Sequence, residues 1–229
     1  MTTYDCSHPL VTGMPVYPDT PPAAIESATA VETDGFATTR LDLDSHTGTH
    51  IDAPAHMHAD GATLEDYALE TFRFTAIVAD CAPLEDRSPI DGDTLEAGLD
   101  GEYRDRDAFA TNGIDLVGCR TGWDAHWGTD RYFDHPYLTV DAASWLRERD
   151  CHVGIDALNV DPSPGAAATD DEPEGYPFHE RLFADERLLL ENLRGLGRLP
   201  TDRPVTIHAY PLSIPGGDAS PVRAVAIVE

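Results

Sequence analysis

Apolar residues along this chain occur in short blocks or alternate with polar residues, a pattern that is typical of strands rather than long helices. Five such stretches predict strands, namely 74–81, 115–123, 151–158, 204–210 and 222–229. An earlier stretch, 26–44, predicts two strands on either side of an Asp34-Gly35 turn. The pattern therefore predicts a fold dominated by strands.

Two segments carry signals of helices. Thr63 followed by Asp66 resembles a capping box, which predicts a short helix over 64–72. A second helix is predicted over 139–150, between two of the apolar blocks, and this strand–helix–strand spacing indicates a parallel crossover. The fold class is therefore mixed α/β, and the length of 229 residues favours a single domain over 1–229.

Three stretches rich in proline and glycine are predicted to be surface loops: 82–93, 122–136 and 161–177. The last of these is long enough to cover a site. The N-terminus lacks a basic region followed by an apolar run, and no apolar stretch approaches the roughly 20 residues that span a bilayer. Four cysteines without a CxxC pair predict buried free thiols, so a cytoplasmic location is expected.

The net charge of the chain limits which surface and which partners can be expected. The chain has 42 acidic residues against 15 basic ones, a net charge of -27, and every basic residue is arginine. The acidic residues are spread along the chain, which predicts a folded surface adapted to a saline, halophilic cytoplasm rather than a disordered tail. Nucleic acid and anionic membranes are excluded as expected partners because both require positive charge.

Residues 46–58 contain four histidines, an aspartate and a proline. Over 41–52 the odd positions except Ser45 are apolar or β-branched, whereas the even positions place His46, His50 and Asp52 on one face of a predicted strand. In a straight strand His46 and His50 would lie roughly 13 Å apart, too far for one metal ion. The chain must therefore bend, and Gly48 is the position where a bend costs least.

Two imidazoles and one carboxylate suit Zn²⁺, or alternatively Mn²⁺. Three protein ligands with an open position would form a catalytic site that acidifies a bound water. His56 follows the strand-ending Pro54 and is predicted to face that water, whereas His58 is expected on the surface.

Other candidates have simpler interpretations. His126 and His135 are expected to be solvent-exposed loop residues, and His208 an ordinary strand histidine. Arg120 and Trp123 follow a strand and could approach a pocket, although a surface ion pair is the more common role of such an arginine. No G-x-S-x-G, Walker-type or Rossmann-type glycine pattern is present.

The string HTGTHIDAPAH resembles the signature of the metal-dependent cyclase family, which includes bacterial kynurenine formamidases (arylformamidases) and isatin hydrolases. Further segments resemble the family in order along nearly the whole chain, namely DCSHPLVTGMPVYPDTPP, CRTGW, GIDALNVDP, FHERLFADERLLLENL and PLSIPGGDASPVRAVAIVE. The resemblance implies a β-barrel-like core with surrounding helices and a homodimer or larger homo-oligomer.

The resemblance also implies the site. His46, His50 and Asp52 would hold one metal, and Asp52 would bridge to a second metal completed by His179 and Glu191. On one continuous helix His179 and Glu191 would be about 18 Å apart. A short helix after Pro177 must therefore end near 184–185 and return Glu191 on another element.

The activity implied is hydrolysis of an amide, with N-formylkynurenine converted to kynurenine and formate, and with His56 as the proton-transfer residue. Tyr17 stands where kynurenine formamidases carry a substrate-contacting tryptophan, although ordinary core packing remains open for it. Two alternatives remain: opening of a cyclic amide or lactone such as isatin, and a non-catalytic metal-binding protein.

Overall fold

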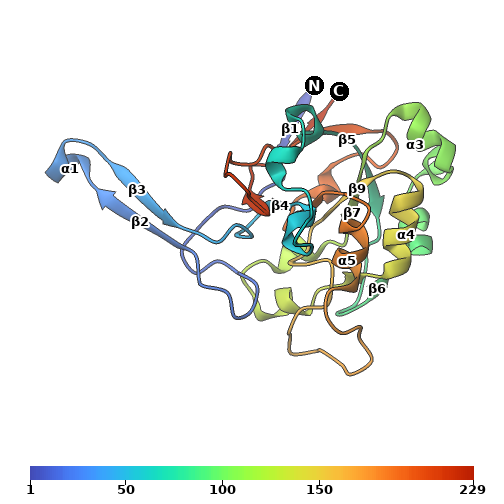
Figure 1. Cartoon of the computed structure of the whole chain (residues 1–229), viewed down its shortest axis with the longest axis horizontal. Coiled ribbons are helices and arrows are strands. Elements are labelled where there is room, and N and C mark those ends of the chain that lie inside the picture. The colour runs from blue at the N-terminus through green and yellow to red at the C-terminus, as the bar shows by residue number, and fades with distance from the viewer.

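The computed structural model describes residues 1–229 and is built on one nine-stranded sheet that curls into a half-barrel (Figure 1). Across the sheet the strands lie in the order β1 (Thr2–Asp5), β13 (Val225–Val228), β11 (Val205–His208), β5 (Arg73–Asp80), β7 (Leu116–Arg120), β9 (His152–Ile155), β10 (Leu189–Glu191), β4 (His50–Asp52) and β12 (Ala219–Pro221). Strands β5, β7, β9 and β10 are parallel, and the remaining pairs are antiparallel. The predicted mixed α/β fold with a barrel-like core is confirmed.

Two apolar clusters cover the two faces of this sheet. On β5, Ile77 and Ala79 belong to the cluster that packs against the helices, whereas Ala76 and Val78 belong to the other cluster. This alternation follows from the period of two along a strand. Besides the one-turn helix α1 (Val31–Asp34), the α-helices are α2 (Gly92–Ala97), α3 (Arg106–Asn112), α4 (Val140–Glu148) and α5 (Pro177–Phe183). No helix is long and apolar enough to cross a bilayer.

The predicted crossover is confirmed. Helix α4 connects β7 to β9, which pair in parallel with Val117 opposite Val153. The helix begins after Thr139, whose hydroxyl oxygen accepts the N–H of Ala142. The four cysteines are free and buried, as predicted.

The prediction of a single helix over 64–72 is wrong. Two short 3₁₀ helices occupy this stretch, η2 (Leu64–Asp66) and η3 (Leu69–Phe72), with extended backbone between them. The Asp66 carboxylate accepts the N–H and the hydroxyl of Thr63 at 2.8 and 2.9 Å, so the capping signal marks a single turn. The extended break lets Leu64 and Phe72 both reach the core.

The loop predicted over 122–136 contains 3₁₀ helices η5 (Trp123–His126) and η6 (Asp130–Asp134) and then leads into β8 (Tyr137–Leu138), which pairs with β6 (Pro89–Ile90). The expected exposure of His135 is wrong, because its side chain is fully buried. Its two ring nitrogens lie 2.8 Å from the Ser163 hydroxyl and from the Pro136 carbonyl, so local partners satisfy it. His126 is half-buried.

The two strands predicted over 26–44 are confirmed as β2 (Ala24–Thr29) and β3 (Thr38–Asp42), joined by the one-turn helix α1 (Val31–Asp34) and by Gly35. This hairpin projects from the body of the molecule as an arm (Figure 1). Val31, Phe36 and Leu41 are 60, 58 and 55% exposed on it. The base of the arm leads directly into the histidine-rich segment.

Candidate active site

The segment between β3 and β4 turns sharply before it enters the sheet. As predicted, the segment is not one straight strand, because β3 ends at Asp42 and β4 begins only at His50. The predicted bend at Gly48 is present, with φ of +68°. A Cβ atom at this position would lie 2.8 Å from Leu10 Cδ2 and 2.9 Å from Met14 Cε. The left-handed backbone therefore favours glycine here, and a larger side chain would also require the ends of Leu10 and Met14 to move.

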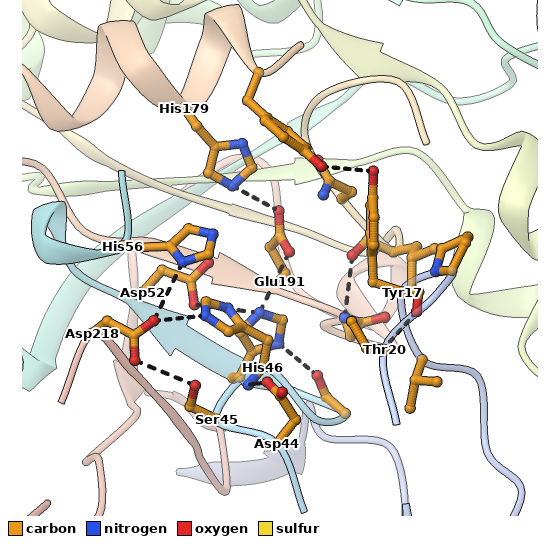
Figure 2. A pocket seen from close by; sticks show the side chains of 18 of the residues that line it. Tyr17, Thr20, Asp44, Ser45, His46, Asp52, His56, His179, Glu191 and Asp218 are labelled. Atoms are coloured by element: carbon orange, nitrogen blue, oxygen red, sulfur yellow. Dashed lines mark hydrogen bonds and ion pairs between the residues drawn. The ribbon is translucent and has the colours of Figure 1, made fainter. Parts of the chain in front are cut away.

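The bend brings together the first three predicted ligands. His46 Nδ1 lies 3.0 Å and His50 Nε2 lies 3.3 Å from Asp52 Oδ1. One ligand atom from each of these residues falls within 4.8 Å of the others. Figure 2 shows His46 and Asp52 converging with His56, His179 and Glu191 on one space.

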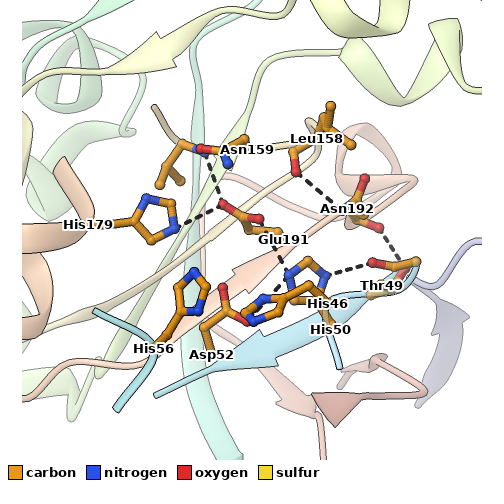
Figure 3. A network of polar contacts seen from close by, with 12 residues as sticks. His46, Thr49, His50, Asp52, His56, Leu158, Asn159, His179, Glu191 and Asn192 are labelled. Atoms are coloured by element: carbon orange, nitrogen blue, oxygen red, sulfur yellow. Dashed lines mark hydrogen bonds and ion pairs between the residues drawn. The ribbon is translucent and has the colours of Figure 1, made fainter. Parts of the chain in front are cut away.

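The second predicted group also assembles. Helix α5 ends at Phe183 and Glu191 returns at the end of β10, as the sequence predicted. Glu191 is opposite His50 in the β10–β4 pair, which places its Oε2 3.4 Å from His50 Nε2. Its other oxygen, Oε1, lies 3.6 Å from His179 Nε2 (Figure 3). Asp52, His179 and Glu191 place ligand atoms within 4.8 Å of one another, so Asp52 belongs to both groups.

The chemistry of these donors fits divalent metal ions. Asp52 is fully buried, and both of its carboxylate oxygens, like His50 Nε2, lack a hydrogen-bond partner. The nitrogens lie near these oxygens without being aligned for hydrogen bonds. Leaving such buried polar atoms unpaired is costly, whereas coordination of a cation would satisfy them together. Imidazoles and carboxylates are ligands of zinc and related ions.

Outer acceptors fix the rings of two histidines. His50 Nδ1 donates to the Gly48 carbonyl at 2.8 Å, which leaves Nε2 free to face Asp52. His179 Nδ1 donates to Asp161 Oδ2 at 2.7 Å, and the same carboxylate accepts the N–H groups of Phe178 and His179 at the start of α5. Such partners set the tautomer and orientation of metal-binding histidines. Asp161 was not predicted, because it is distant in sequence from His179 and no local pattern marks it.

The charges of His46, His50 and Asp52 shift one another's pKa values. Burial opposes the charged form of His46, but the Asp52 carboxylate outweighs it and raises the pKa of His46 to about 9. Burial likewise opposes the charged form of His50, but the Asp52 carboxylate outweighs it and raises the pKa of His50. Burial would raise the pKa of Asp52, but the charges of His50 and His46 hold it well below its usual value. Without metal the cluster therefore holds protons that a metal ion must displace.

His56 lies at the end of the 3₁₀ helix η1 (Pro54–His56), beside the cluster rather than within it. Its ring centroid is 4.1 Å from that of His46 and 5.9 Å from that of His179, and its side chain is 32% exposed. Burial and then the positive charge of His46 lower the pKa of His56, so the imidazole is neutral near pH 7. A neutral, partly exposed imidazole at this position can accept a proton.

A cavity of about 540 Å³ opens over these residues. Tyr17 lines it, and its hydroxyl lies 3.1 Å from that of Tyr176, which the long 161–177 loop presents from the other side. The cavity therefore combines aromatic rings with the histidine and carboxylate cluster. Tyr176 was missed because nothing in its local sequence marks it.

Other residues considered from the sequence lie elsewhere. His58 is half-buried with Nε2 3.4 Å from the Glu180 carbonyl, and Trp123 is buried in the core. Arg120 forms the expected ion pair, at 2.6 Å from Asp80, and His208 ends β11. None of these four residues lines the cavity.

Comparison with known proteins places the chain among related sequences. The model of the family described as "Putative cyclase" matches residues 4–162. Kynurenine formamidases from Bacillus cereus and Bacillus anthracis are 29% and 28% identical over 224 residues, which cover 96% of this chain and 95% of each relative.

Solved structures are similar as well. Isatin hydrolase A from Labrenzia aggregata aligns with a TM-score of 0.83 and 26% identity, over 99% of this chain and 93% of that one. A structure described as a "Potential Metal-Dependent Hydrolase With Cyclase Activity" aligns with a TM-score of 0.74 and 31% identity, over 98% of this chain and 96% of that one.

Proposed function

Because the chain belongs to this cyclase family, we propose that it is a metal-dependent hydrolase of amide bonds. The observation that carries the proposal is a buried cluster of imidazoles and carboxylates with unpaired ligand atoms, open to a cavity that a neutral histidine also faces. The residues that would hold the metal are His46, His50, Asp52, His179 and Glu191. We propose zinc, one ion in each group with Asp52 shared between them, with Mn²⁺ as the alternative.

A bound ion of this kind supplies Lewis acidity, which polarises a carbonyl and lowers the pKa of water. The protein's own residues supply proton transfer and placement. His56 accepts a proton from the attacking water through its free ring nitrogen and returns it to the leaving nitrogen as the C–N bond breaks. Tyr17 and Tyr176 present aromatic faces on which a planar aryl group of the substrate can pack.

The proposed substrate is N-formylkynurenine, hydrolysed to kynurenine and formate in the breakdown of tryptophan. Its support is the full-length similarity to proteins named kynurenine formamidase. Ring opening of isatin or a similar cyclic amide is a second candidate, which the TM-score of 0.83 to an isatin hydrolase favours. Both reactions need the same attack on a carbonyl, so the shape of the cavity must choose between them.

Purified, metal-loaded protein in high salt separates these substrates. We expect kcat/KM for formate release from N-formylkynurenine to exceed kcat/KM for isatin opening by about tenfold or more, equivalent to about 1.4 kcal/mol of transition-state discrimination. Formate is measured by a coupled enzymatic assay and isatin opening by loss of its absorbance. The reverse ratio would assign the protein to the second candidate.

We also propose that the acidic surface is an adaptation to salt. With a net charge of -27 and no lysine, self-repulsion destabilises the folded state at low ionic strength. The melting temperature should therefore rise with KCl from low to molar concentration, with simple screening saturating as the Debye length falls to about 3 Å near 1 M. A melting temperature that does not change over this range, measured by calorimetry, would rule out the adaptation.

The homodimer or larger homo-oligomer stays a prediction, supported by the exposed apolar side chains of Val31, Phe36 and Leu41 on the projecting arm. The cytoplasmic location also stays a prediction. A small-molecule substrate is consistent with the named activities of the relatives and with the size of the cavity.

A further inference from the structure

Asp218 is an acidic residue that lies beside the histidines although it is distant from them in sequence. Its Oδ2 lies 3.1 Å from His46 Nε2 and 3.3 Å from His56 Nδ1, so a single carboxylate oxygen contacts two rings (Figure 2). Its other oxygen accepts the hydroxyl of Ser45 at 3.3 Å. The carboxylate therefore joins one residue of the metal cluster to the histidine beside it.

The backbone around Asp218 is fixed relative to the cluster. The Ala53 N–H donates to the Asp218 carbonyl at 2.8 Å, and the Leu64 N–H donates to the Gly217 carbonyl at 3.0 Å. The next residue, Ala219, begins β12 and is opposite Asp52 in the β12–β4 pair. The sheet that places Asp52 therefore also places the Asp218 carboxylate.

The contacts of Asp218 resemble those that hold the other two histidine rings of the site. The rings of His50 and His179 are each held by an outer acceptor, the Gly48 carbonyl and the Asp161 carboxylate. The two remaining histidines of the site share one such acceptor. We propose that Asp218 is a positioning residue that orients His46 and His56 together, an inference that rests on the proposed function.

Each ring gains a defined role from this arrangement. When His46 donates Nε2–H to Asp218, its Nδ1 faces Asp52 at a distance of 3.0 Å. When His56 donates Nδ1–H to the same oxygen, its Nε2 carries a free lone pair for proton transfer. Asp218 thus places His46, a proposed metal ligand, and also sets the tautomer of His56, the proposed base.

Two substitutions separate orientation from charge. Asp218→Ala removes the acceptor, whereas Asp218→Asn can keep an amide oxygen at the Oδ2 position and loses only the charge. Glu65→Ala is the matched control, because the Glu65 carboxylate accepts the N–H of Gly216 in the same loop without touching a histidine. Circular dichroism melts verify that each variant is folded.

The first readout does not need activity. In metal-free wild type, nitrogen-15 spectra of the histidine rings should show His56 as the neutral tautomer protonated at Nδ1. Asp218→Ala should convert this signal to a mixture of tautomers and weaken zinc affinity about tenfold in competition with a chromophoric chelator. Asp218→Asn should keep the Nδ1 tautomer, and Glu65→Ala should match wild type in both measurements.

The second readout is kinetic. Asp218→Ala should lower kcat about 10- to 100-fold with KM within about threefold, and Asp218→Asn should recover about tenfold of that loss. An unchanged His56 tautomer together with unchanged zinc affinity in Asp218→Ala would overturn the proposal, as would an effect on KM alone, which indicates substrate contact. If wild type hydrolyses no amide, the proposed function fails, while the spectra and zinc affinities still decide the role of Asp218.

Discussion

Replacing Asp52 with alanine is expected to remove bound metal and abolish measurable turnover. Asp52 is fully buried, contributes to both groups of ligand atoms, and supplies the negative charge nearest His46 and His50. Loss of an outer partner of a metal ligand typically costs about 10- to 100-fold in affinity or activity, so loss of a shared ligand must cost more.

The measurement is metal content by mass spectrometry after gel filtration, together with hydrolysis rate. Asp42→Ala is the matched control, because it removes an acid of the same segment whose side chain is exposed on β3. The control should keep wild-type metal content and activity. Wild-type metal content in the Asp52→Ala protein would contradict the shared role of Asp52.

Replacing His56 with alanine is expected to give the opposite combination: metal retained and activity lost. The ring of His56 lies beside the cluster, with its centroid 4.1 Å from that of His46, and its neutral state near pH 7 suits proton transfer. Removing a positioned general acid–base typically lowers the rate by roughly 10²–10⁴-fold. Metal content and kcat measured on the same preparation test this division of roles.

His58→Ala is the control for this variant, because it removes a second histidine two residues further along, outside the cavity. It should change kcat by less than about twofold. Full activity of His56→Ala would exclude proton transfer by His56, and loss of metal from that variant would make His56 a ligand instead.

The elements that could be predicted from sequence were those determined by local chemistry. A straight strand would hold His46 and His50 too far apart, and Thr47-Gly48-Thr49 is a poor helix interior, so the chain had to turn at Gly48. The structure has the left-handed turn there. The resemblance implied that His179 and Glu191 share a metal, and the length of a helix then required that separate elements carry them, as they do.

The features that could not be predicted depend on which segments meet in space. The 64–72 segment has a helical signal, but its ends pack into the core only with an extended break between η2 and η3. His135 is buried because Ser163, far along the chain, supplies its partner. Asp161 and Asp218 contact histidines that are distant in sequence, so no local pattern marks them.

Metal-dependent hydrolysis is tested decisively by release of formate from N-formylkynurenine by the wild-type protein with and without metal. Protein stripped with a chelator at high salt should release no formate above the uncatalysed rate, because the buried ligand atoms would then have no ion to hold. Stepwise addition of zinc should restore the rate and reach a plateau at a fixed number of ions per chain. Metal binding at this site without hydrolysis of N-formylkynurenine, isatin or a related amide would contradict metal-dependent amide hydrolysis and indicate a structural metal site.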